Sequence, residues 1–159
     1  MKRTQAVPLI LLAVGGGVVT YLVELLLQSS GAPAALPPYS LSLTLVGIAI
    51  ADILLAIPVR RLITGKRKER LSPFYAVRVA VLAKASSHAG ALLFGVGVGM
   101  VIFLVARPIA PNWDLLGRAI AAAASAAIVM TAGLIAERMC QLPPDDTDKE
   151  SVGDAATRA

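Results

Sequence analysis

Four long apolar stretches alternate with short polar or proline-containing segments along the chain. The stretches cover about residues 6–27, 41–60, 80–106 and 114–138. An α-helix needs roughly 20 mostly apolar residues to cross a bilayer core of about 30 Å, and each stretch meets that length. The pattern predicts an all-α fold, an integral membrane four-helix bundle, in which residues 1–140 form the transmembrane unit.

Proline and capping residues indicate where the predicted helices begin and end. A proline-rich segment at residues 33–38 follows the first stretch, and proline cannot continue a helix because it lacks a backbone N–H. Ser72 and Pro73 are typical of an N-cap and a first helical residue, and Asn112 is a second candidate N-cap. Residues 141–159 are polar and acidic without apolar periodicity, which predicts a disordered cytoplasmic tail.

The cations concentrate in one connecting segment. Between the second and third stretches the chain carries Arg60, Arg61, Lys66, Arg67, Lys68 and Arg70. Because Lys and Arg gather in cytoplasmic loops, we expect both termini in the cytoplasm and a multi-pass protein of the plasma (inner) membrane. Small residues at 31–35 leave open that the first stretch is a cleaved signal peptide, although its apolar run exceeds the usual length of roughly 7–15 residues.

The composition indicates a bilayer rather than water as the solvent. The chain is 57% hydrophobic and 16% charged, with a mean hydropathy of +0.74. A net charge of +5 does not indicate nucleic-acid binding here, because aromatics make up only 4% of the residues and do not interleave with the cations. Cys140 is the single cysteine, which excludes an internal disulfide.

Asp52 is the costliest charge in the predicted bundle, because it falls near the middle of the second stretch. We expect it to face the bundle interior and to be protonated. Counting residues along the spans places Gly15–Gly17 and the Ser125 hydroxyl at its depth as hydrogen-bond partners. A proton or cation relay that combines Asp52 with His88 is the alternative.

One face of the predicted third helix combines polar and small residues. Lys84, Ser87 and His88 share it with Gly95 and Gly99 at helical spacing. The two glycines form a GxxxG pair, which lets another backbone approach closely. We expect them to pack on the alanine-rich run of the fourth helix, with a dimer interface as the alternative.

Lys84, His88, Glu137 and Arg138 should lie at one depth near the cytoplasmic surface. They are candidates for an ion-pair network between the third and fourth helices or for a small anionic-ligand site. We expect no metal site, because His88 has no second histidine and no spaced cysteines beside it. We expect no catalytic residues and no cofactor, because Ser87 beside His88 lacks an orienting acid and adjacent residues do not face each other on a helix.

Several segments resemble a known family. The start Met-Lys-Arg-Thr, the third helix RVAVLAKASSHAGAL with its following glycines, and the ending AERMCQLPPDD are similar to an uncharacterised actinobacterial family of small four-helix membrane proteins, classed as a domain of unknown function. The last helix of that family often ends in Glu followed by paired cysteines. Glu137 and Cys140 match, but Met139 replaces a cysteine, which argues against cysteine-pair chemistry.

We therefore expect a non-enzymatic membrane protein that acts as an accessory or scaffold for a membrane complex. Its partners would be the lipid bilayer and a membrane protein or further copies of itself. Residues 60–70 would either bind anionic lipid or only fix the orientation of the chain. The alternative is a small oligomeric transporter or channel subunit that uses Asp52 and His88.

Overall fold

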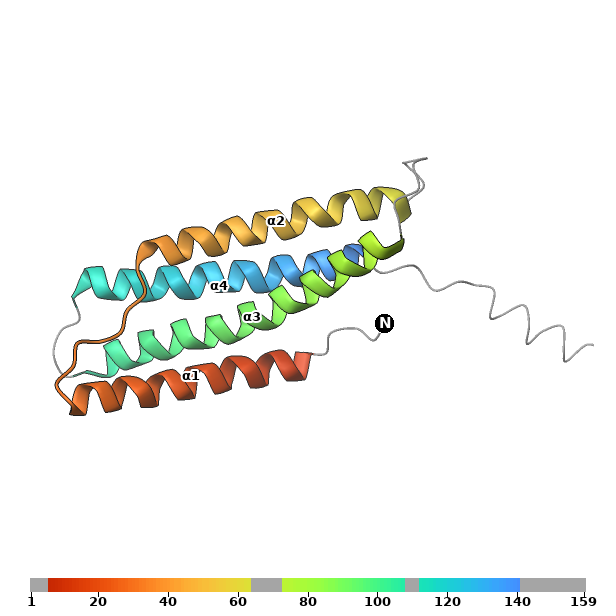
Figure 1. Cartoon of the computed structure of the whole chain (residues 1–159). Helices are drawn as coiled ribbons and strands as arrows, with labels where there is room; N and C mark the ends of the chain where they lie inside the picture. Colours follow the sequence, from red (N-terminus) through yellow and green to blue (C-terminus); the bar gives the residue numbers. More distant parts are fainter. Residues whose placement is uncertain (1–5, 64–72, 108–111, 141–159) are drawn as a thin grey trace, which may run out of the picture.

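The computed structural model describes residues 6–63, 73–107 and 112–140 (Figure 1). These residues form α1 (Ala6–Ser29), α2 (Tyr39–Ile63), α3 (Pro73–Ala106) and α4 (Trp113–Met139), and no strand occurs among them. All four helices are long and apolar enough to cross a membrane. The prediction of an all-α, four-span membrane protein is confirmed.

The helix ends follow the local sequence signals. Asn112 caps α4, because its side-chain oxygen accepts a hydrogen bond from the Asp114 N–H at 3.0 Å. At the end of α1, Gly31 takes a left-handed φ of +72°, which glycine adopts without steric cost. The chain then runs without regular structure from Ala32 to Pro38 before α2 begins. Pro73 is the first residue of α3, as predicted.

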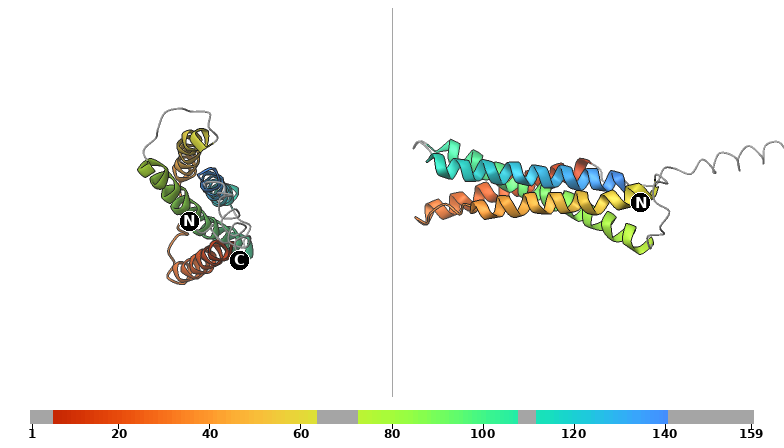
Figure 2. Two further views of the ribbon diagram at one scale, coloured as in Figure 1. Left: turned by 90° about the vertical axis from the view of Figure 1, so that its right-hand side faces the viewer. Right: turned by 90° about the horizontal axis from the view of Figure 1, so that it is seen from above.

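The helices form an open arrangement with α3 in its centre (Figures 1 and 2). Among the described residues, α1 packs on α3 alone, whereas α4 packs on both α3 and α2. α2 meets α3 over a shorter stretch, and α3 runs at a slant to its neighbours. We name the end where α2 begins the Tyr39 end and the opposite one the Arg60 end.

Two clusters of buried side chains form the interior. The first core lies between α2 and α4 and consists of Leu45, Ala49, Ala126, Val129 and Ala132. The second core lies nearer the Arg60 end, joins α2, α3 and α4, and consists of Ala56, Val59, Val79, Ala83 and Ala136. Both are rich in alanine because helices in lipid associate through van der Waals contact, which small residues at the interface make possible.

The glycines of α3 serve two different neighbours. A Cβ at Gly99 would lie 2.5 Å from the Gly17 carbonyl oxygen of α1, and one at Gly95 would collide with the Ala13 carbonyl. The glycine that faces the alanine run of α4 is instead Gly97, where a Cβ would lie 2.7 Å from the Cα of Ala123. The expectation that Gly95 and Gly99 pack on the fourth helix is therefore wrong. Their partner is the first helix.

Candidate functional site

Asp52 lies inside the bundle, between the two cores. Its side chain is only 3% exposed, one turn of α2 away from Ala49 on one side and Ala56 on the other. The Ser86 hydroxyl of α3 donates a hydrogen bond to the carboxyl group. The second oxygen, Oδ2, has no hydrogen-bond partner among the described residues. This pair is a polar contact between α2 and α3 inside the bundle.

The partner of Asp52 differs from the expected one. Gly15–Gly17 belong to α1, which makes no packing contact with α2, and the Ser125 hydroxyl bonds to Ala122 O of its own helix at 3.0 Å. The predicted partners of Asp52 rested on the assumption that all four spans run parallel to one another. α3 has 34 residues and is slanted, which brings Ser86 to the level of Asp52 (Figure 2). Because of the slant, Asp52 is a neighbour of the polar segment of α3. The sequence alone predicts Asp52 in the middle of its span and that segment near the cytoplasmic surface.

The polar segment of α3 is bonded within its own helix. The Ser87 hydroxyl donates to the Lys84 carbonyl at 2.8 Å, and His88 Nδ1 lies 2.7 Å from the same oxygen. The short second distance indicates the tautomer with its proton on Nδ1. Ser87 is fully buried because Gly133 of α4 packs on its backbone, where a Cβ would lie 2.7 Å from the Ser87 nitrogen. The Ser87 hydroxyl also lies 3.4 Å from His88 Nδ1, so the two side chains are neighbours that share the Lys84 carbonyl.

Exposed cations surround the second core at the Arg60 end. We call Arg60, Arg61, Arg78, Lys84 and Arg138 the cationic rim, and all five are exposed. They come from α2, α3 and α4. Glu137 next to them is buried, with 9% of its surface exposed. Lys66, Arg67, Lys68 and Arg70 lie outside the described residues.

Glu24, near the end of α1, is a second buried carboxylate, which the sequence analysis did not single out. It is 3% exposed, because the connection to α2 folds back over it and the Ala35 N–H donates to Oε1 at 3.2 Å. Its Oε2 has no partner among the described residues. The only sequence signal was a charge within an otherwise apolar run, which does not reveal a fold-back of the following loop.

A second polar group at the Tyr39 end joins α2 to α4. Arg118 forms an ion pair with Asp114 at 2.7 Å, and its guanidinium lies 5.4 Å from the centre of the Tyr39 ring. The Tyr39 hydroxyl donates weakly to Asp114 at 3.4 Å. The i, i+4 spacing of Asp114 and Arg118 was the available signal for the ion pair.

Two grooves indent the apolar surface. One of about 480 Å³ runs between α1 and α3, and one of about 330 Å³ lies between α2, α3 and α4 near the connection at Ala35–Pro37. No charged residue lines either groove. Within the part of the chain that the structure describes, no three His, Cys, Asp or Glu side chains are close enough to hold a metal ion.

These features define a small multi-pass membrane protein in which helices pack through glycine and alanine, with buried carboxylates and a cationic end. The chain belongs to the DUF3180 family, described as a protein of unknown function, whose profile matches residues 9–144. The match confirms the resemblance to an uncharacterised family of unknown function. A search of curated proteins found no match, and a search of solved structures found none either.

Proposed function

We propose that the protein is a non-enzymatic accessory or scaffold of the plasma membrane that holds a membrane-protein partner at its Arg60 end. The observation that carries this proposal is the cationic rim. Its exposed side chains come from three helices that pack on one core, so the backbone positions that carry them are held together. A cluster of like charges suits an acidic partner surface or a layer of anionic lipid headgroups.

The polar groups inside the bundle support a scaffold over an enzyme. Ser87 and His88 both bond to the Lys84 carbonyl, so neither is presented to a substrate. Asp52 is enclosed between the cores and is paired with Ser86. A serine nucleophile needs a base with a free lone pair, and His88 Nδ1, 3.4 Å from the Ser87 hydroxyl, is engaged with the Lys84 carbonyl at 2.7 Å.

A pull-down in mild detergent tests the partner. The variant Arg61→Gln/Lys84→Gln removes two rim charges, and Arg107→Gln/Arg118→Gln removes two charges at the Tyr39 end as a matched control. We expect a membrane protein to co-purify with wild type and with the control, and its yield to fall at least fivefold with the rim variant, at about 1 kcal/mol per charge. Recovery of the protein alone from wild-type cells would contradict the proposal.

The orientation of the rim is tested through Cys140, the single cysteine, which follows α4 at the Arg60 end. Burial raises the pKa of the Cys140 thiol, so its reactive thiolate form increases only at alkaline pH. We expect a membrane-impermeant thiol reagent to label it from the cytoplasmic side, and faster at pH 9 than at pH 7. Labelling from the opposite side would overturn the cytoplasmic placement.

A small oligomeric transporter or channel subunit is the second candidate, and the unpartnered Oδ2 of Asp52 favours it. A carboxyl oxygen free of hydrogen bonds inside a membrane span could exchange a proton. The test is pH-dependent flux into liposomes. If wild type carries such flux and Asp52→Asn loses it, the scaffold proposal gives way to this one.

A further inference from the structure

The groove between α1 and α3 is the largest indentation described above. Its floor consists of Gly17, Gly95 and Gly99, where the two backbones approach closely, and its walls are branched and aromatic side chains such as Val18 and Phe94. Side chains on the floor would collide with the opposite backbone, so the floor stays bare. The close glycine contact between α1 and α3 therefore determines how deep the groove is.

No described part of the chain covers this groove, since α1 packs on α3 alone. In a bilayer an open apolar groove is filled by whatever is apolar and flexible enough to follow its shape. The lining runs along α1 from Ala13 to Leu22, a rise of roughly 14 Å. That is close to half of a bilayer core of about 30 Å, which is the depth of one leaflet.

One end of the groove, the one toward the Tyr39 end of the bundle, lies near a headgroup layer. Leu22 lies one to two turns of helix before α1 ends at Ser29, and Ile102 lies about one turn before α3 ends at Ala106. Along the helix axis these intervals are roughly 10 Å in α1 and roughly 6 Å in α3. An acyl chain in the groove would thus enter from the Tyr39 end.

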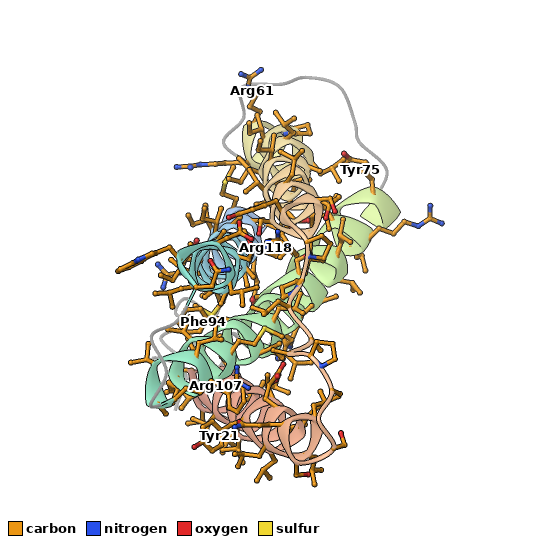
Figure 3. The ribbon with its side chains drawn as sticks, turned by 90° about the vertical axis from the view of Figure 1, so that its left-hand side faces the viewer. Tyr21, Arg61, Tyr75, Phe94, Arg107 and Arg118 are labelled. Atoms are coloured by element: carbon orange, nitrogen blue, oxygen red, sulfur yellow. The ribbon has the colours of Figure 1, made fainter. Side chains whose placement is uncertain are left out.

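The cationic side chain of Arg107 lies at this end of the groove. The Arg107 guanidinium lies 4.8 Å from the centre of the Phe103 ring, and the Phe103 ring meets the ring of Tyr21 edge to face at 6.1 Å. Tyr21 also lines the groove. Seen from the Tyr39 end, Tyr21 and Arg107 lie where α1 and α3 meet (Figure 3).

The charge of Arg107 is not neutralised by an ion pair with any of the described carboxylates. The nearest acid along α1 is Glu24, which bonds to the Ala35 N–H and faces a small void with Ala34 and Leu36, not the groove. A planar guanidinium suits a phosphate group, to which it donates two parallel hydrogen bonds.

We propose that the α1–α3 groove binds one acyl chain of an anionic phospholipid from the leaflet at the Tyr39 end, and that Arg107 binds the phosphate. This site lies at the opposite end of the bundle from the cationic rim and does not depend on the proposed scaffold function. The shape of the groove would hold the acyl chain of this lipid, and the charge of Arg107 would hold its phosphate.

The test is lipid retention, measured by native mass spectrometry of full-length protein released from nanodiscs of equal parts phosphatidylglycerol and phosphatidylcholine. Wild type should retain phosphatidylglycerol in preference. Val18→Phe, which places a ring in the groove, should retain neither lipid. Val19→Phe is the matched control, since Val19 is similarly exposed on the same helix but does not line the groove.

Arg107→Gln should lower retention of phosphatidylglycerol about fivefold and that of phosphatidylcholine less, because the choline cation already offsets the charge of its phosphate. This variant leaves the groove intact, so it keeps the proposal testable if Val18→Phe fails to fold. The rim variant Arg61→Gln/Lys84→Gln should still retain phosphatidylglycerol in preference to phosphatidylcholine, because the groove and Arg107 are unchanged, which separates this proposal from the scaffold proposal.

Equal retention of both lipids by wild type, or equal retention by Val18→Phe and Val19→Phe, would overturn the proposal. So would a wild-type dimer that Val18→Phe dissociates, because a second copy would then occupy the groove.

Discussion

α1 and α2 both contact α3, but by different means. α1 approaches through glycines, with Gly99 close to the Gly17 backbone and Gly16 close to Leu92. α2 meets α3 through side chains, with the Asp52–Ser86 hydrogen bond and the second core. The α1–α3 contact depends on the close fit of two backbones over many residues. The α2–α3 contact consists of the Asp52–Ser86 pair and a few apolar side chains.

This difference determines how each helix responds to change. A backbone contact has no side chain that can rotate to relieve a clash, so added volume must separate the helices. A side-chain contact can lose one hydrogen bond and keep its apolar neighbours. α1 is also the helix with the least support, because it packs on α3 and on neither α2 nor α4 in the described ranges.

Gly95→Leu should have the largest effect, because its side chain would collide with the Ala13 backbone. We expect a loss of about 3 kcal/mol from the free energy of unfolding and separation of α1 from the other helices. The measurement is a denaturing-detergent titration, followed by energy transfer between dyes at positions 7 and 140.

Gly15→Leu is the matched control for this prediction, because a Cβ at Gly15 meets nothing within 4 Å. It should change the unfolding free energy little. Equal stability of the two variants would mean that close backbone approach does not attach α1.

Ser86→Ala should have the next largest effect. It leaves the Asp52 carboxyl buried without its hydrogen-bond donor, at a cost of about 2 kcal/mol. The double variant Asp52→Leu/Ser86→Ala removes both polar groups and should recover most of that loss. The same titration measures both, and a double variant less stable than Ser86→Ala would indicate that Asp52 has a further stabilising partner.

The sequence predicts the helices well because each depends on local signals. Apolar runs of spanning length, Pro73 at the start of α3 and Asn112 as the cap of α4 all specify local structure without knowledge of the neighbours. The burial of Asp52 follows from the cost of a charge in hydrocarbon, wherever its partner lies.

The contacts between helices were harder to predict. A GxxxG pair at Gly95 and Gly99 indicates close approach but not the partner, since both α1 and α4 offer small residues. The pairing of Asp52 with Ser86 depends on the slant of α3, which a count of residues along one helix does not contain. The burial of Glu24 depends on a loop that folds back eleven residues later.

Glu24→Leu tests the polar contact that α1 makes outside its helix packing. It removes the acceptor for the Ala35 N–H, which should cost about 1 kcal/mol and speed hydrogen exchange of that amide about fivefold. Glu24→Gln keeps an acceptor oxygen at the same position and should exchange nearly as wild type. Fast exchange in Glu24→Gln as well would mean that the carboxylate charge, not the hydrogen bond, holds the connection.

Arg118→Gln should have the smallest effect, although its ion pair with Asp114 is short at 2.7 Å. The two side chains are 37% and 49% exposed, so water and salt screen the attraction, and we expect a loss of about 0.5 kcal/mol. In 1 M salt the difference from wild type should nearly vanish in the same titration. The Ser86→Ala loss should persist in that salt, because Asp52 is buried. If salt reduced both losses equally, the polar pair between α2 and α3 would be as open to solvent as the ion pair within α4, and burial would not be what distinguishes them.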